Sequence, residues 1–490
     1  MIARSLSAPV STVPRTGAAR TSYERPPTRP HVGHRTDAAW STPAIERLRR
    51  RVLRILRRSA CMGCRCRCGG CMARKRDVVR VIAARYLSRA GSEAAFFVGV
   101  WGKAAFDFNA TSSQIAGLMF VLSVVSILGS VIGGVLVDRY GPRRVLIGAE
   151  VLFVPATLAV AFARDIGSLT ALVAFWGLVG APVMTSGASF APFLVGDDEN
   201  ELRKMNSWLE SAGSAAFITG PALGSLIVHY ANVDWVFYID AATSLVAAVL
   251  VARTILVHPR REHEHGTPLR EFRDGIATAY RARSLRFYVL AGTVVWLGFG
   301  AFSALEPLFF RDVLKTGVEA IGYMNSLFGA GILAGALLLQ RLPKKVVSAR
   351  GLCIAVVLTG LGSIAYVGTS SIRVVAVGAV MWGIVIGVLE PLLRTLLHRD
   401  SPAGMVGRIT GTAQVHRQAG ELLPLAFAPW LAAVFGVQLT LIAGGITVAI
   451  VALLALREAG AIDRAAGSHP LPDVEVATLI VSDEPISPNR

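Results

Sequence analysis

Residues 114–144 read QIAGLMFVLSVVSILGSVIGGVLVDRYGPRR, a long uncharged run that ends in a cluster of charges. A helix needs roughly 20 apolar residues to cross a hydrocarbon core of about 30 Å, and this run is long enough. Only helices and closed barrels satisfy the backbone in lipid, and the run is too long and too uniformly apolar for a barrel strand. The stretch therefore predicts a membrane-spanning helix.

Similar runs recur along the chain, which is 53% apolar and only 17% charged. This composition gives far more apolar surface than one soluble core needs, so we expect lipid to be the natural solvent of the chain. The predicted spans are 80–106, 114–137, 145–163, 168–194, 205–230, 235–257, 286–311, 319–340, 351–369, 372–397, 407–434 and 437–457. The predicted fold class is an all-α integral membrane protein with twelve transmembrane helices.

The first six predicted helices resemble the last six. A shift of 205 residues superposes Asp107 on Asp312, Gly117 on Gly322, Met119 on Met324 and Arg203 on Arg408. We therefore expect two pseudo-symmetric six-helix halves, residues 79–257 and 286–457, an architecture found in transporters. The polar segment 258–285 is expected to link the halves in the cytoplasm.

Basic residues gather in alternate loops. One set of loops holds Arg139, Arg143, Arg144, Arg203, Lys204, Arg341, Lys344, Lys345, Arg350, Arg399 and Arg408. The other set is poor in basic residues and holds Arg164 and Lys315. Because cytoplasmic loops collect Lys and Arg, we expect both termini in the cytoplasm of a multi-pass cell-membrane protein.

The net charge of +18 lies almost wholly in the N-terminal region. Residues 1–80 hold 19 Lys and Arg against 4 acidic residues, which leaves a nearly neutral body and argues against a nucleic-acid partner. Residues 1–78 are predicted to be a basic, Cys-containing, disordered extension, and residues 458–490 a disordered tail. Residues 47–58 fit either a basic helix on an anionic membrane or, as we favour, a solvated tail. The body is expected to begin near Met72.

Two segments contain residues that bind metals. Five cysteines fall within eleven residues: Cys61, Cys64, Cys66, Cys68 and Cys71. The linker adds His258, Glu262, His263, Glu264 and His265. No second Cys or His pair follows the cysteines at zinc-finger spacing. We favour solvated segments in both places and expect neither a metal site nor a cofactor.

The charged end of the opening stretch has a defined spacing. Its residues are Gly134, Asp138, Arg139, Gly141, Arg143 and Arg144. This pattern resembles the signature loop of the major facilitator superfamily. Gly141 permits a tight turn, and the Asp138 carboxylate can meet basic side chains or a helix N-terminus, so the cluster is a candidate conformational latch. The alternative is a merely basic loop. The second half keeps the basic residues but lacks the Asp-Arg pair, so any latch is asymmetric.

A second motif lies in the fifth predicted helix. Gly213, Gly220, Pro221 and Gly224 resemble the Gly-Pro motif of exporters in the superfamily, although such residues also serve plain helix packing. With residues 206–209 and 235–243, the motif resembles the drug:proton antiporter branch that includes macrolide and siderophore exporters. A basic residue expected in helix four of many drug antiporters is absent, so no proton relay through it is assumed.

Ionisable side chains inside the predicted helices are costly in lipid and suggest function. They are Glu93, Lys103, Glu210, Asp240, Glu306, Glu390, His416, Arg417 and Glu421. The resemblance implies that helices one, four, seven and ten line a central cavity, which would bring Glu93, Glu306 and Glu390 to substrate or protons. Arg417 and Glu421, four residues apart, are expected to form an ion pair. Aromatic residues suited to an amphiphilic ligand are Phe96, Phe97, Trp101, Trp296, Phe299 and Phe302.

These features predict a secondary transporter, a proton-coupled exporter of amphiphilic small molecules that works as a monomer. A carboxyl group in an apolar cavity can hold a proton and release it when water or a cation arrives, which is the chemistry of antiport. An importer of the same fold, a membrane enzyme and a transport-inactive scaffold are the alternatives. The sequence has none of the metal, nucleophile or nucleotide motifs of an enzyme or a primary pump, so we expect no enzymatic activity.

Overall fold

A computed structural model describes residues 69–196, 198–255, 268–402 and 404–467 of the chain. The predictions on the basic and Cys-rich segment up to residue 68, on the linker histidines and on the tail beyond residue 467 lie outside these residues.

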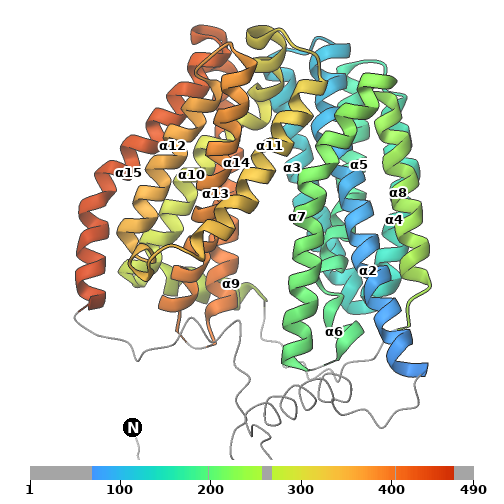
Figure 1. Cartoon of the computed structure of the whole chain (residues 1–490), viewed down its shortest axis with the longest axis horizontal. Coiled ribbons are helices and arrows are strands. Elements are labelled where there is room, and N and C mark those ends of the chain that lie inside the picture. Colours follow the sequence, from blue (N-terminus) through green and yellow to red (C-terminus); the bar gives the residue numbers. More distant parts are fainter. Residues whose placement is uncertain (1–68, 197, 256–267, 403, 468–490) are drawn as a thin grey trace, which may run out of the picture. The chain divides into compact units, whose positions relative to one another are not determined.

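The first half is a bundle of helices (Figure 1). Its elements are α2 (Gly69–Ala94) with the π-helical turns η1 (Ala95–Val100) and η2 (Gly102–Asp107), α3 (Ser112–Tyr140), α4 (Pro142–Ala161), α5 (Ile166–Ala188), α6 (Ala191–Val195), α7 (Glu199–Tyr230) and α8 (Asp234–Ala252). Capping side chains set several of the helix starts. Thr111 caps α3 in a capping box with Gln114, and Asp165 and Asp198 accept backbone N–H bonds at the starts of α5 and α7.

The second half follows the helix α9 (Pro268–Arg281). It contains α10 (Arg283–Leu308) with the π-helical turn η3 (Phe309–Leu314), α11 (Glu319–Leu339), the short turn η4 (Lys344–Val346), α12 (Ala349–Val367), α13 (Ile372–Asp400), α14 (Val406–Phe435) and α15 (Val437–Gly467). Within the described residues, eleven helices are long and apolar enough to cross a membrane. The twelfth is α2 with its two π-turns, whose five charges within residues 80–103 lower its hydropathy. The predicted all-α membrane fold is confirmed.

Both halves pack by the same rule. In the first half α2 packs on α7, α3 on α5 and α4 on α8, which pairs the first helix with the fifth, the second with the fourth and the third with the sixth. In the second half α10 packs on α14, α11 on α13 and α12 on α15, which are the same three pairings. The internal repeat in the sequence is thus matched by a repeat in packing.

Some boundaries differ from the prediction. α15 continues to Gly467, beyond the predicted end at 457, because its last turns are tied to other helices. Arg283 donates two hydrogen bonds to Glu458, at 2.6 and 2.7 Å, and Asp463 accepts backbone N–H bonds at the start of α12. The linker also contains a helix, α9, which packs on α14, where Tyr280 and His416 share a hydrogen bond of 2.6 Å.

The two halves meet at the end of the bundle that carries Arg311, called here the Arg311 end. Arg311 Nη1 donates to the backbone oxygens of Ala105 at 2.8 Å and Ala110 at 3.2 Å, which joins η3 to the end of the first transmembrane helix. Nearby, Gly322 of α11 lies directly against the Pro221 oxygen of α7, a closeness that a side chain would prevent. The opposite end, which carries the α3–α4 loop, is called the Asp138 end.

Candidate functional site

A cavity of about 420 Å³ lies between the two halves. The first half contributes only aromatic residues to its wall: Phe96, Phe97, Trp101 and Phe217. The second half contributes further aromatic residues and all the charged ones: Glu306, Glu390, Arg394, Arg417 and Glu421. This is the size and character of a small-molecule site, with apolar walls and a few polar groups that fix orientation.

Glu306 is the buried carboxyl group of the cavity. It is 7% exposed, and its Oε1 accepts a hydrogen bond from Tyr366 Oη at 2.7 Å and one from Asn325 Nδ2 at 3.3 Å. None of the ion pairs among the described residues includes Glu306. The sequence pointed to Glu306 but not to Tyr366 or Asn325, which lie on α12 and α11.

Glu390 of α13 is half-buried and lines the part of the cavity that is nearer the Asp138 end. It also lines a smaller adjoining cavity of about 90 Å³, together with Arg394, His398 and Arg417. Glu390 and Arg394 are four residues apart and so share one face of α13. Glu390 thus stands among basic groups, whereas Glu306 is held by neutral donors.

The expected ion pair between Arg417 and Glu421 is not formed. The Arg417 guanidinium lies over the Trp296 ring, 3.9 Å from its centroid, in a cation–π contact. No ion pair within the described part of the chain joins Arg417 to Glu421. Both side chains line the cavity.

Glu93, the third candidate for contact with substrate or protons, points elsewhere. It is buried between α2 and α7, where it pairs with Arg89 at 2.5 Å and packs against Gly220. It is not among the residues that line the cavity. Lys103 is likewise engaged, in an ion pair of 2.6 Å with Asp234.

The aromatic residues named from the sequence all line the cavity, and they are joined by others. Trp382 is the centre of the group. Its ring stacks on Phe299 at 4.8 Å between centroids and lies 4.9 Å from Phe302 and 5.5 Å from Tyr366. Such a wall suits planar or hydrophobic ligands. Trp382 had a signal in the sequence, the repeated Trp-Gly of residues 176–177 and 382–383, but that repeat carried no hint of a cavity.

The candidate latch lies at the α3–α4 junction. Gly141 has a φ of 81°, which a glycine adopts readily, and it ends α3 and starts α4. Arg143 donates to the Ala252 oxygen at 2.5 Å, so the start of α4 is tied to the end of α8. Arg139 lies over the Tyr140 ring, and Asp138 is exposed in the last turn of α3. Gly134 faces open space.

The helix-five motif lies where three helices meet. Gly220 lies against the backbone of Ala90 on α2, and Gly224 packs on Ala94 and Val98. The Pro221 oxygen faces Gly322 of α11, in the contact between the halves. Gly213 faces open space, where a methyl group would have no neighbour within 4 Å. Three of the four motif residues therefore serve close packing.

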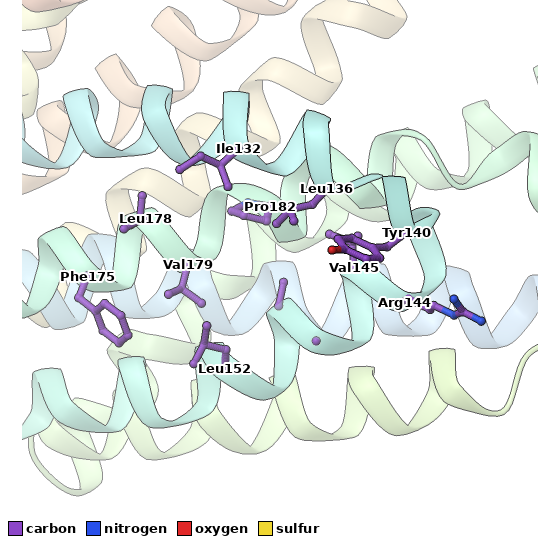
Figure 2. A pocket seen from close by; sticks show the side chains of 12 residues that line it. Ile132, Leu136, Tyr140, Arg144, Val145, Leu152, Phe175, Leu178, Val179 and Pro182 are labelled. Carbon is purple, nitrogen blue, oxygen red and sulfur yellow. The ribbon is translucent and has the colours of Figure 1, made fainter. Parts of the chain in front are cut away.

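A second hollow lies on the first half alone, between α3, α4 and α5 (Figure 2). It has a volume of about 490 Å³, and its wall is apolar apart from Tyr140 and Arg144 at one end. It contains no residue of the second half, so it is separate from the cavity between the halves.

The sequence profile of the Major Facilitator Superfamily matches residues 82–424. The chain belongs to this superfamily. The match covers helices of both halves, and it agrees with the signature loop at residues 134–144.

Among curated superfamily proteins, the chain resembles two kinds of efflux protein. Macrolide efflux protein A of Streptococcus pyogenes is 28% identical over 237 residues, which cover 46% of this chain and 58% of that protein. The chain thus spans less than two-thirds of the streptococcal protein. The multidrug efflux pump Tap of Mycobacterium tuberculosis is 25% identical over 351 residues, which cover 68% of this chain and 81% of Tap.

Solved structures share the fold. The nucleoside transporter NupG superposes with a TM-score of 0.63 at 10% identity, over 78% of this chain and 99% of NupG. A bacterial homologue of the human lysosomal transporter Spinster, in an inward-facing and unoccupied conformation, gives 0.59 at 11% identity, over 80% and 98%. At these identities the likeness is one of fold. The superfamily match over residues 82–424 and the similar efflux proteins point to a transporter rather than to an enzyme.

Proposed function

We propose that the protein exports amphiphilic small molecules in exchange for protons, by alternating access of the cavity between its halves. The observation that carries this proposal is Glu306, a buried carboxyl group in the cavity that takes part in none of the ion pairs among the described residues. The efflux proteins similar to this chain support export rather than import. The names of these relatives favour macrolides and other drugs as the substrate class.

The chemistry follows from the surroundings of Glu306. An ionised carboxylate without a counter-ion is costly in such a place, so Glu306 must either carry a proton or face a cation. A cationic substrate that enters the cavity can replace the proton, and the aromatic wall binds the rest of the ligand. Proton and substrate then compete for one carboxyl group, which is the requirement for exchange.

In this proposal Glu390 accepts the proton that Glu306 releases. It lies between the main cavity and the smaller one toward the Asp138 end, so a proton that leaves Glu306 has an acceptor on its way out. Glu93, paired with Arg89, has a weaker claim to contact substrate or protons.

The proposed orientation places both termini, the linker and the Asp138 end in the cytoplasm, as the loop charges suggest. In that orientation the contacts of Arg311 lie on the outer face, and we propose that the cavity opens toward the cytoplasm. Arg143 and Asp138 would then act at the cytoplasmic face, where the latch has to open and close. We propose that the protein works as a monomer, because the whole cavity is built from one chain.

The test of exchange uses inverted membrane vesicles and a fluorescent amphiphilic cation. An imposed pH gradient, acid inside, is expected to drive accumulation by the wild type and not by Glu306→Gln. Glu199→Gln, which removes an exposed carboxylate in the first turn of α7, is the matched control and should accumulate normally. Wild-type vesicles that concentrate no substrate under any imposed gradient of protons would contradict the proposal. Accumulation only in right-side-out vesicles would favour an importer.

The orientation has its own test. In intact cells, a membrane-impermeant thiol reagent should label Ser112→Cys at the start of α3, and should label Lys345→Cys in the α11–α12 connection only after permeabilisation. The reverse pattern would overturn the proposed topology while leaving the exchange mechanism open.

A further inference from the structure

The first half contains a polar interior that takes no part in the cavity. It lies among α2, α4 and α8, where α8 packs on both α2 and α4. At its centre are two carboxyl groups that are almost fully buried, Glu150 of α4 at 2% exposure and Asp240 of α8 at 0%. Neither lines the cavity between the halves. Burial of this kind is expensive in a membrane protein and calls for a reason.

The polar side chains form two tiers, each with one carboxyl group. In the tier nearer the Arg311 end, Asp240 Oδ2 accepts a hydrogen bond from Thr157 Oγ1 at 2.7 Å, and Ser92 Oγ lies 3.4 Å from Oδ1. In the other tier, Ser88 and Ser244 face Glu150. Hydroxyl groups from all three helices therefore point at the carboxyl groups, in place of the apolar packing found in the rest of the half.

In the tier that contains Glu150, some hydrogen-bonding atoms lack a partner among the described residues. Glu150 Oε2 and Ser244 Oγ are buried and make no hydrogen bond to any residue in the described ranges. Beside Glu150 is a small cavity of about 20 Å³, whose mostly apolar lining includes the polar side chains of Arg85, Ser88, Arg89 and Glu150. A space of this size with polar groups in its wall holds about one water molecule. The cavity is also lined by Val81, Leu146 and Val251, which lie toward the Asp138 end.

The charges around these tiers do not balance. The buried carboxyl groups are Glu93, Glu150 and Asp240, and the cations that face them are Arg85 and Arg89. Arg89 is taken by Glu93, and Arg85 is shared between Glu150, Glu93 and the exposed Glu210 of α7. The sequence of α5 contains no titratable residue. Among the described residues the three buried carboxylates therefore exceed the two arginines by one negative charge, and a single proton would cancel it.

We propose that Glu150 and Asp240 form a second proton-binding site, enclosed in the first half, which takes one proton from water at the Asp138 end. The proton enters by the small cavity beside Glu150 and is held in the tiers between α2, α4 and α8. This site extends the proposed exchange mechanism but does not depend on it, since the charge excess exists whatever the cavity transports.

Asp240 of this site is in close contact with α2, so its charge can affect the position of that helix. Gly91 of α2 lies so close to Asp240 and Thr243 that a methyl group there would collide with both. Phe96 and Phe97 follow one to two turns later on the same transmembrane helix and form part of the cavity wall. A change in the charge of Asp240 therefore acts on the helix that carries these rings, which gives the site a route to the cavity.

Infrared difference spectroscopy of the purified full chain in lipid nanodiscs tests this inference. Spectra are compared between neutral and alkaline pH in the Glu306→Gln background, which removes the buried carboxyl group of the cavity. A carbonyl band of a protonated carboxyl group is expected, and it should disappear in Asp240→Asn or in Glu150→Gln. Glu199→Gln, which removes an exposed carboxylate of the same half that lies outside this charge network, should leave the band unchanged.

A milder variant guards against misfolding. Thr157→Val keeps both carboxyl groups and removes the hydrogen bond to Asp240 Oδ2, so the band should persist at a shifted frequency. A band that survives both Asp240→Asn and Glu150→Gln, or no band at all in the parent protein, would overturn the site. A failure of gradient-driven transport in the wild type would instead contradict the exchange mechanism and leave this result untouched.

Discussion

The two halves share one packing pattern and distribute their ionisable groups differently. In the first half Glu93, Glu150 and Asp240 are enclosed within the bundle, and the cavity wall of that half is aromatic. In the second half Glu306, Glu390 and Glu421 line the cavity. At the shift of 205 residues, Glu150 and Asp240 correspond to Ala355 and Gly445, and Glu306 corresponds to Trp101. Duplication thus preserved the helix contacts while the charges moved between interior and cavity.

This difference assigns different tasks to similar residues. A carboxyl group in the cavity can meet substrate and water as the halves move, so its titration can drive transport. A carboxyl group enclosed between three helices of one half contacts only the side chains around it. Its loss should therefore first lower the stability of that half and change its motion. Variants of the cavity carboxyl groups should therefore lose transport first, and variants of the enclosed carboxyl groups should lose stability first.

The largest effect is expected for Glu306→Gln. Amide and carboxyl have the same size, so binding and substrate exchange without a gradient should survive, while uphill transport falls to the level of empty vesicles. Counterflow and gradient-driven uptake, measured on the same vesicle preparation, separate the two. Loss of both activities in a normally folded variant would assign Glu306 to substrate binding alone.

Asp240→Leu should be the most destabilising single change in the first half. The substitution leaves the Thr157 hydroxyl buried without an acceptor, which costs about 1–3 kcal/mol, whereas Asp240→Asn keeps an acceptor and should cost less. Thermal unfolding in detergent compares the two variants. Equal unfolding temperatures for Asp240→Leu and the wild type would remove the structural role of this carboxyl group.

Asp138→Asn tests the latch. Asp138 lies in the last turn of α3, outside the cavity, so the variant should slow the transport cycle and leave the affinity for ligand unchanged. Equilibrium binding and transport rate are measured together. A parallel fall in affinity would count against a latch at this position.

Tyr366→Phe should give the smallest effect. The variant keeps the aromatic ring and removes one of the two hydrogen bonds to Glu306 Oε1, a change of about 1 kcal/mol or roughly five-fold in rate. Phe302→Leu, which removes a ring but no hydrogen bond, is the companion variant. A complete loss of uphill transport in Tyr366→Phe would make the tyrosine part of the proton path.

The sequence predicted the membrane fold because its signals are local. Uncharged runs, basic loops and the Gly141 turn each depend on neighbouring residues, and the repeat gave the division into halves. Glu306 was predictable from its place on helix seven. An all-apolar stretch does not show which side of a membrane helix faces a cavity. Glu93 was therefore expected in the cavity, whereas in the structure it forms an ion pair with Arg89.

The polar interior of the first half was missed for a related reason. Glu150 falls within the predicted span 145–163, five residues after its start and just beyond the basic loop. A charge so near the end of a predicted helix can belong to the loop or to the interior, and only the three-dimensional packing of α2, α4 and α8 decides between them. Tyr366 and Asn325 carry no signal, because a hydroxyl or an amide in a long apolar helix is common.

Proton movement that accompanies substrate tests exchange through Glu306 directly. Proteoliposomes with an internal pH indicator and no imposed gradient receive a pulse of substrate from the outside. The expected result is a proton flux opposite to the substrate flux, present in the wild type and in Glu199→Gln and absent in Glu306→Gln. Substrate entry without proton movement in the wild type, or an unchanged proton flux in Glu306→Gln, would contradict exchange through this carboxyl group.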